Sequence, residues 1–418
     1  MSGTAGYFDS PWPGEDAGPQ RRQVALFGDE PRVSGTWTLV TRPAMVATMV
    51  VLRAPGEVYL LCHTGGDAAI SWVEQIDPVT LEMRRRSPDL PGGKTWPGGV
   101  AAHANGSLYV AFGRHVHRLS PDLEVLASAE MPRDRPYNSF VILPDGSLVT
   151  KDFGGALPGE SSDVVSATTQ LVILEPDQLT TITTLELPEG SVARLSADDN
   201  DIYVVGTHSL MRCRYEPSTR RCVRDETLTV PYRRDGEGYG WDAVIADGSA
   251  WFLNNGEGSQ NYDGSLLGKG EATRGQVIVR VELTTGALVR YNVNDQPGAV
   301  VANPPAVDCV RGIVVGYDSG HRVVTAWDYR SEPARHLWTR TIGHGGHPIV
   351  LEVLGAVVLG DYDPATHDEA LMVIDVTSGD QLARVSGVSP IQSVLFGARG
   401  FDHDIYVCTF LSVSRVST

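Results

Sequence analysis

Four residues of this sequence could take part in acid–base chemistry: Lys151, Asp152, Tyr137 and His347. A lysine packed among aromatic side chains loses hydration, which lowers its pKa and lets it act as a base or form an imine. His347 ends a Gly-His-Gly-Gly-His motif, and an imidazole exchanges protons near neutral pH. The alternative for Lys151 and Asp152 is an ion pair that braces neighbouring repeat units (blades) of the fold. We expect the four residues to be catalytic.

Carboxylates and imidazoles offer a second kind of chemistry, which is metal binding. Asp152, Asp318 and Asp361 each follow a short apolar run, and carboxylate oxygens suit calcium or magnesium. Histidines such as His63 and His208 could instead hold zinc or iron, which we favour less. The alternative is that the carboxylates are solvated loop charges. The cofactor is therefore unknown from sequence, with a divalent cation at these aspartates as the hypothesis.

Polar and aromatic residues that flank the apolar runs form the candidate binding set for a small molecule. The residues are Trp96, Asn138, Arg194, Trp241, Asn303, Tyr317, Gln392, His63 and His208. The turns at the other ends of the runs consist mostly of Gly, Asn, Asp and Pro, which turn geometry alone explains. This asymmetry predicts a pocket on one side of the fold.

Repeated hairpins must position these residues. The stretch 137–153 reads YNSFVILPDGSLVTKDF, which is a strand, a tight turn and a second strand. Similar units span residues 47–63, 99–114, 137–152, 192–208, 241–255, 305–318, 348–361 and 393–409. Two more strands follow most units, and four antiparallel strands recurring about every 40 to 65 residues are typical of propeller blades.

The repeats predict an all-β fold, a propeller with eight four-stranded antiparallel blades; seven blades are the alternative. The last unit stops after its third strand, so a strand near residues 36–41 is expected to supply the fourth and close the ring. Residues 1–22 are predicted to be a flexible N-terminal tail, and residues 23–418 a single propeller domain.

Blade geometry predicts where the candidate residues meet. The first strand of a blade starts on the face where the second strand ends, so both sets of flanking residues surround the central funnel. Two long loops on this face, 153–169 and 256–275, are rich in Gly and Ser. We expect them to fold over the funnel as lids.

The turn motifs also carry a family resemblance. Pro144-Asp-Gly-Ser-Leu148 and Asp247-Gly-Ser-Ala-Trp251 are similar to blades of the strictosidine-synthase-like, SMP-30-like and PQQ-like propeller groups. The resemblance implies architecture only. The repeated blade-end tryptophan of quinoprotein dehydrogenases is absent from the sequence, and the metal-binding set of the SMP-30-like group does not map onto it.

Composition excludes several classes of function. The chain has 418 residues and a net charge of -17, which disfavours binding to nucleic acid or to an anionic membrane. A membrane-spanning helix needs about 18 consecutive apolar residues, and no run in this sequence approaches that length. No secretion signal is evident either, so we expect a cytoplasmic protein. Cys213 and Cys222 flank one hairpin and could pair, although reduced thiols are favoured.

These observations predict an enzyme, a hydrolase, lyase or isomerase, that processes a small molecule in the central funnel. The alternative is a non-catalytic propeller that binds a ligand or another protein. A perturbed lysine or histidine in a metal-binding pocket would favour the enzyme. The sequence leaves substrate and oligomeric state open.

Overall fold

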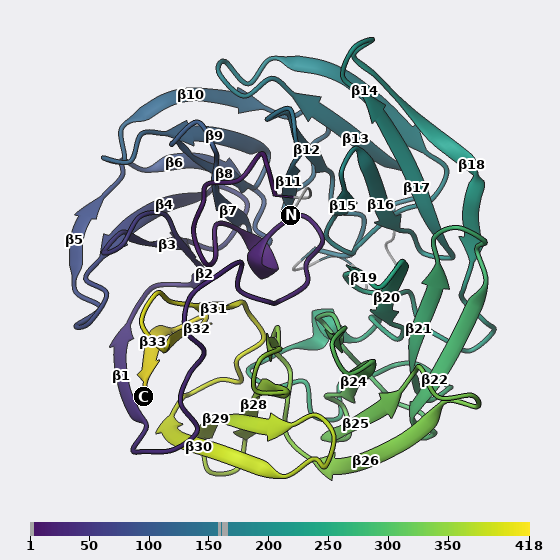
Figure 1. Cartoon of the computed structure of the whole chain (residues 1–418). Helices are drawn as coiled ribbons and strands as arrows, with labels where there is room; N and C mark the ends of the chain where they lie inside the picture. Colours follow the sequence, from purple (N-terminus) through teal and green to yellow (C-terminus); the bar gives the residue numbers. More distant parts are fainter. Residues whose placement is uncertain (1–3, 158–159, 161–165) are drawn as a thin grey trace.

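The protein is an eight-bladed β-propeller in which every blade has antiparallel strands (Figure 1). The computed structural model describes residues 4–157, 160 and 166–418. Eight separate sheets confirm the predicted blade number and exclude the seven-bladed alternative. The only helical elements among the described residues are two three-residue 3-10 turns, η1 (Glu15–Ala17) and η2 (Ser259–Asn261). No helix in the described part of the chain could span a membrane.

The first four blades follow one another from residue 47 to residue 231. Blade 1 contains β2 (Ala47–Leu52), β3 (Val58–His63), β4 (Ala69–Ile76) and β5 (Met83–Arg86), with β6 (Leu90–Gly93) also paired to β4. Blade 2 contains β7 (Gly99–Ala102), β8 (Leu108–Phe112), β9 (His115–Leu119) and β10 (Val125–Glu130). Blade 3 contains β11 (Phe140–Ile142), β12 (Leu148–Lys151), β13 (Thr169–Leu174) and β14 (Thr181–Leu187). Blade 4 contains β15 (Ser196–Asp198), β16 (Asp201–Val205), β17 (Ser209–Glu216) and β18 (Arg221–Pro231).

The remaining blades complete the ring. Blade 5 contains β19 (Val244–Ala246), β20 (Ser249–Leu253), β21 (Gln276–Glu282) and β22 (Leu288–Asn294). Blade 6 contains β23 (Ala306–Asp308), β24 (Ile313–Asp318), β25 (Val323–Asp328) and β26 (Arg335–Thr341). Blade 7 contains β27 (Ile349–Leu351), β28 (Ala356–Asp363), β29 (Asp368–Asp375) and β30 (Gln381–Val388). Blade 8 contains β31 (Gly397–Arg399), β32 (Asp404–Thr409), β33 (Ser412–Ser417) and β1 (Thr38–Pro43).

Turn chemistry and burial explain why these runs form blades. Ala246 pairs with Ser249 across a two-residue turn in which Asp247 and Gly248 have φ of 49° and 68°. Such turns favour Asp-Gly because both residues must adopt positive φ. Inner strands such as β2 are buried along their whole length, whereas the outermost β30 alternates between exposed and half-buried residues. The core therefore lies between neighbouring blades.

The ring is closed by the N-terminal strand, as predicted. β1 is the outermost strand of blade 8 and pairs antiparallel with β33, from Thr38 opposite Ser417 to Pro43 opposite Ser412. Hydroxyl pairs add to the ladder, with 2.8 Å between the Oγ atoms of Thr38 and Ser417. This pairing covers the edge that a three-stranded last blade would expose.

The segment expected to be a flexible tail is instead packed in the central channel, so that expectation is corrected for residues 4–22. Figure 1 shows it crossing the middle of the ring, with η1 near the axis. The Trp12 and Gln20 carbonyls accept hydrogen bonds from the Leu52 and Ile245 amides at 2.9 and 2.8 Å. The innermost strands expose unpaired amides along the channel, and the segment satisfies several of them.

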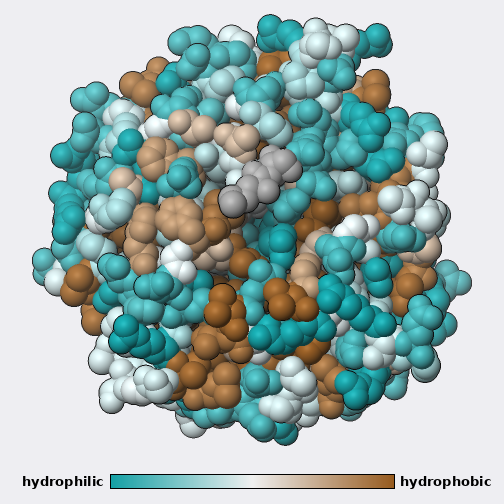
Figure 2. All heavy atoms as spheres, in the orientation of Figure 1, coloured by the Kyte–Doolittle hydropathy of each residue, from teal (hydrophilic) through white to brown (hydrophobic). Residues whose placement is uncertain are grey.

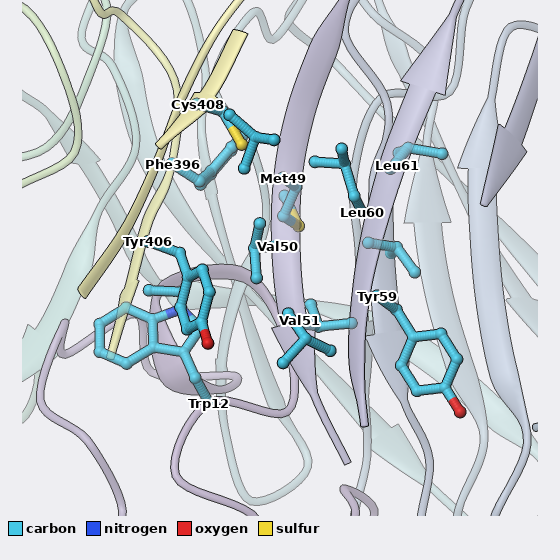
Figure 3. Close-up of a cluster of buried hydrophobic side chains, with 14 of the residues drawn as sticks. Trp12, Met49, Val50, Val51, Tyr59, Leu60, Leu61, Phe396, Tyr406 and Cys408 are labelled. Carbon is cyan, nitrogen blue, oxygen red and sulfur yellow. The ribbon is translucent and has the colours of Figure 1, made fainter. Parts of the chain in front are cut away.

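Apolar packing holds the same segment in place. Trp12 is 1% exposed and belongs to a core cluster with Val51 and Tyr406, which Figure 3 shows between the first and last blades. On the face seen in Figure 2, hydrophilic residues predominate, and apolar residues form scattered groups both at the rim and nearer the middle. The segment is thus part of the folded core.

The five cysteines are free in the structure. Cys213 faces Arg224 across the β17–β18 ladder, whereas Cys222 faces Tyr215. The two thiols are therefore offset in register, which leaves them as buried, reduced side chains and agrees with the favoured reading.

Candidate functional site

A cavity of about 310 Å³ lies in the funnel, where the connections into the innermost strands converge. It brings together seven of the residues that the sequence singled out: His63, Trp96, Asn138, Arg194, Trp241, Asn303 and His347. Six of the seven precede an innermost strand, and His63 ends β3. The funnel geometry inferred from the hairpin repeat therefore places these residues around one space.

An aspartate and a histidine from opposite ends of the chain meet at the cavity wall. His347 Nδ1 lies 2.8 Å from Asp16 Oδ1 and 3.0 Å from Asp16 Oδ2, and its ring packs 4.0 Å from the Phe396 ring. Asp16 is fully buried. The Nδ1–H of the imidazole donates to the carboxylate, and Nε2 has no hydrogen bond to any described residue. This arrangement leaves Nε2 available to a ligand.

Arg21 and His347 hold the Asp16 carboxylate in its ionised form. Arg21 Nη1 is 2.5 Å from Asp16, and the same guanidinium also pairs with Glu15. Burial by itself would raise the pKa of Asp16, but His347 and Arg21 together hold it below its usual range. The carboxylate can therefore fix the tautomer of His347 without taking its proton.

Arg194 links the N-terminal segment to the cavity. Its guanidinium pairs with Glu15 at 3.0 Å, donates to the carbonyls of Asn138 and Pro97, and lies 4.6 Å from the Phe396 ring centre. Burial lowers the pKa of Arg194, partly offset by Glu15 and Asp242. The terminal nitrogens of Arg194 already donate hydrogen bonds to protein acceptors. Arg194 therefore forms part of the cavity wall and is not placed to form an ion pair with a ligand.

Three lining residues retain acceptor atoms without a hydrogen-bond partner among the described residues: Asp242 Oδ2, Asn138 Oδ1 and His63 Nε2. Asp242 Oδ1 accepts from the Arg194 amide at 2.6 Å. His63 Nδ1 is 2.7 Å from the Thr64 carbonyl, so Nε2 carries the lone pair, and burial lowers the pKa of His63 to about 4. All three atoms are buried, and Asp242 Oδ2 also lies 3.8 Å from Arg21 Nη1, so they face protein groups and not the cavity.

Aromatic rings form much of the remaining wall. The Trp96 ring stacks on Phe153 with 4.2 Å between centroids, and Trp241 lies 6.2 Å from Tyr239. Most of the other lining side chains are apolar, including Phe410 from blade 8. A flat, largely apolar ligand body would be matched by these rings.

The loop 256–275 covers the cavity. Ser259, Gln260, Tyr262 and Leu266 line it. The Tyr262 hydroxyl donates to the Gln392 carbonyl, and the Leu266 amide donates to Gln392 Oε1, both at 2.8 Å. Gln392 is therefore an anchor for this loop and does not line the cavity. The other expected lid, 153–169, includes 158–159 and 161–165, which lie outside the described residues.

Lys151, Asp152 and Tyr137 do not line the cavity. Lys151 is fully buried and its Nζ donates to the Ser191 carbonyl at 2.9 Å. Burial lowers the pKa of Lys151 to about 8, against the opposing effect of Asp152. Asp152 pairs with Arg133 at 2.9 Å, and the Tyr137 hydroxyl accepts from the Arg133 amide at 3.2 Å. The structure thus places these three expected catalytic residues in internal bonds.

Two more expected ligand-binding residues lie elsewhere. His208 is exposed, and its Nδ1 is 3.0 Å from Thr207 Oγ1. Tyr317 is buried edge-on against His344, with its hydroxyl 3.5 Å from the Gly346 carbonyl. Neither residue reaches the cavity wall.

The expected metal carboxylates are separated and already partnered. Asp318 binds His321 at 2.6 Å, and Asp361 pairs with Arg384 at 3.0 Å. With Asp152 they belong to three different blades. Among the described residues, no group of three or more His, Cys, Asp or Glu side chains is placed to hold a metal ion. These donor sets do not fit the calcium or magnesium hypothesis.

The site residues that sequence reasoning missed come mainly from the N-terminal segment: Glu15, Asp16 and Arg21. The only local signal was Trp12, because a tryptophan is unusual in a solvated tail.

Comparisons with known proteins show the fold. No protein-family model matches the chain, and no curated protein is similar in sequence. A europium-containing methanol dehydrogenase superposes with a TM-score of 0.65 at 9% identity, covering 95% of this chain and 89% of its own. BamB from Moraxella catarrhalis has a TM-score of 0.57 at 11% identity, covering 92% and 98%. The Dos1 propeller also has a TM-score of 0.57, at 10% identity, covering 93% and 94%.

These neighbours define the class as a β-propeller. One is a dehydrogenase by name, whereas the names of the other two state no activity. At about one identical residue in ten, the likeness carries no assignment of chemistry to this chain.

Proposed function

We propose that the protein binds a small organic molecule in the funnel cavity and moves a proton on it through the Asp16–His347 pair. The observation that supports this proposal is the buried carboxylate on Nδ1, which leaves Nε2 of a cavity-lining imidazole free. A histidine held in this way is a general base, and general acid–base catalysis typically contributes about 10²–10⁴-fold in rate.

The chain's own residues divide the work. Asp16 holds the Nδ1 proton, so the Nε2 lone pair can take a proton from a bound ligand and later return it. Trp96 and Trp241 match the apolar faces of the ligand, and the loop 256–275 limits water. An isomerase, or a lyase that begins with proton removal, fits this set.

The test exploits solvent deuterium, because a reversible proton transfer exchanges ligand hydrogen with water. The protein is incubated in deuterated buffer with a panel of small metabolites, and mass spectrometry records incorporated deuterium or conversion. Wild type is expected to label or convert at least one bound compound. His347→Gln should reduce that rate by about 10²-fold or more, and the exposed His208→Gln should leave it unchanged.

The opposite outcome identifies the non-catalytic alternative. A compound that binds the cavity tightly but is neither labelled nor converted by wild type would make the protein a ligand-binding propeller. Equal rates for wild type and His347→Gln would remove His347 from the reaction.

A further inference from the structure

The funnel cavity carries hydrogen-bond donors that the Asp16–His347 pair does not use. The indole N–H groups of Trp96 and Trp241 have no acceptor among the described residues. Neither nitrogen belongs to the buried polar atoms that lack a partner, so both donors are accessible from the cavity that their rings line. A ligand in this cavity can therefore accept a hydrogen bond from an indole.

Asn303 presents an acceptor close to His347. Its side-chain nitrogen donates to the carbonyls of Gly345 and Val394, the second at 2.8 Å, so Oδ1 is the atom that faces outward. Asn303 Oδ1 has no donor among the described residues and is not a buried atom. Gly345 lies two residues before His347, whose amide donates to the Leu395 carbonyl, so both side chains rest on the same two backbone segments. Asn303 Oδ1 and His347 Nε2 therefore border the same part of the cavity.

The charges around the cavity favour an uncharged ligand. Arg194 pairs with Glu15 at 3.0 Å. Arg21 pairs with Glu15 and Asp16 and lies 3.8 Å from Asp242. Among the described residues that surround the cavity, these cations and carboxylates are thus paired with one another. An anionic ligand would find no free cation there, and a cationic ligand no unpaired carboxylate, so either would lose hydration without compensation.

We propose that the cavity binds an uncharged aromatic α-hydroxy ketone, and the fate of its reacting C–H group rests on the proton transfer proposed above. The aromatic ring suits the apolar walls, which include Trp96, Trp241 and Phe410. The ketone oxygen accepts from an indole N–H, and the hydroxyl donates to Asn303 Oδ1. The carbon that bears the hydroxyl then carries the proton that His347 Nε2 takes.

The size of the cavity fits this class of molecule. The cavity has a volume of about 310 Å³. A water-sized group needs about 15 Å³ of such space, so there is room for about twenty such groups. A phenyl ring with a three-carbon hydroxy-ketone chain has about eleven heavy atoms, which is roughly half of that capacity.

The chemical step is balanced between the ligand and His347. The C–H bond on the hydroxyl-bearing carbon breaks, its proton passes to Nε2, and its electron pair forms the carbon–carbon double bond of an enediolate. Negative charge develops on the ketone oxygen, where an indole N–H stabilises it. Return of the proton to the same carbon restores the ligand. Return to the former carbonyl carbon, with the hydroxyl proton moving to the enolate oxygen, gives the isomeric hydroxy ketone.

The binding experiment uses the full-length wild-type protein and ligand-observed NMR with 1-hydroxy-1-phenylpropan-2-one. Four further probes each change one feature. 1-Phenylpropan-2-one lacks the hydroxyl, 1-phenylpropan-1-ol lacks the carbonyl, the cyclohexyl analogue lacks the aromatic ring, and mandelate carries a carboxylate in place of the ketone. We expect saturable binding of the hydroxy ketone and binding about fivefold or more weaker for each of the four probes.

Two tryptophan variants test the contact with the ketone oxygen. Trp96→Phe and Trp241→Phe each keep an aromatic ring and remove one N–H. At least one of them should slow deuterium incorporation at the hydroxyl-bearing carbon by about tenfold or more, because a lost donor to a developing oxyanion costs rate. Trp327→Phe is the matched control, since Trp327 lies outside the cavity lining and its Nε1 donates to the Asn292 carbonyl at 2.8 Å.

Binding and exchange can fail separately. No saturable binding of the hydroxy ketone, or equal affinity for mandelate or the cyclohexyl analogue, would overturn the ligand class even if another compound is labelled by the protein. Unchanged exchange in folded Trp96→Phe and Trp241→Phe proteins would overturn the indole contact. Selective binding without deuterium incorporation would support the ligand class and contradict the proton transfer. The probe comparison uses wild type, so it decides the class even if a variant fails to fold.

Discussion

Two carboxylate-containing pairs sit close to the funnel, and the structure uses them differently. In the Asp16–His347 pair, one imidazole nitrogen is bound and the other borders the cavity. In the Lys151–Asp152 pair, the ammonium donates to Ser191 and the carboxylate is bound by Arg133. Both pairs sit where strands open towards the channel, yet only the first keeps an atom free for a ligand.

The contrast shows that position on the funnel side of a blade is not sufficient for chemistry. What matters is whether protein groups already satisfy every donor and acceptor of the side chain. The Lys151 ammonium donates to the Ser191 carbonyl and the Asp152 carboxylate accepts from Arg133, so protein groups already bind both side chains. The His347 imidazole has a single hydrogen-bond partner among the described residues, Asp16, and the proposed proton transfer rests on this arrangement.

The largest expected effect concerns the support of the first pair. Arg21→Met leaves Glu15 and Asp16 buried without their shared cation, so it should lower the free energy of unfolding by about 3–5 kcal/mol. The matched control is Arg22→Met, since Arg22 is one-third exposed and pairs with Glu352 at the surface. That change should cost less than about 1 kcal/mol. Denaturant unfolding measures the stability of both variants. Equal losses would show that the buried Arg21 charge stabilises the fold no more than the exposed Arg22 charge does.

The second pair should give a purely structural response. Asp152→Asn removes the charge opposite Arg133 but keeps an acceptor for the Gln170 amide, so we expect a loss of about 1–3 kcal/mol in stability. The exposed Asp134→Asn is the control and should be nearly neutral. Ligand binding in the funnel should survive both changes. If a folded Asp152→Asn protein lost ligand binding in the funnel, Asp152 would have to be counted again among the site residues.

The smallest effect at neutral pH is expected for Lys151→Met. The variant loses the bond to Ser191 but also removes a buried charge, so the net change at pH 7 should be below about 1.5 kcal/mol. The folded-state pKa of Lys151, about 8, lies below its ordinary value of 10.5. The unfolded chain therefore binds more protons between these values, and stability rises with pH across that window.

Comparing the stability of wild type with that of Lys151→Met at each pH isolates the contribution of the Lys151 titration. From pH 8 to pH 10.5 the stability of wild type relative to Lys151→Met should increase by up to about 3 kcal/mol. Thermal unfolding across that range measures the difference. A constant difference would mean that Lys151 titrates normally in the folded protein.

The repeat made the fold readable from sequence. Apolar runs joined by Asp-Gly or Asn-Gly turns predicted the inner hairpins, and β2 and β3 match the first predicted unit. The closing strand followed from an incomplete last blade. The N-terminal segment was misjudged because irregular backbone that pairs with strand edges has no periodicity to detect.

The site was only partly predictable for a related reason. Seven wall residues were found because strand ends converge in any propeller. Asp16 was missed because it is 331 residues from His347, and no local pattern links them. The internal partners of Lys151 and Asp152 were equally invisible, since Ser191 and Arg133 reach these two side chains through tertiary packing alone.

Closure by β1 also affects how the chain is made. Residues 38–43 leave the ribosome more than 300 residues before their partners, residues 412–417. The Gln23 carbonyl similarly accepts a hydrogen bond from the amide of Val350, a residue that is made much later. Until β33 has been made, β1 has no partner strand. Such long-range pairing slows folding and prolongs exposure to aggregation. We therefore expect a chain that stops before β33 to remain open and to recruit chaperones, even though most blades are already complete.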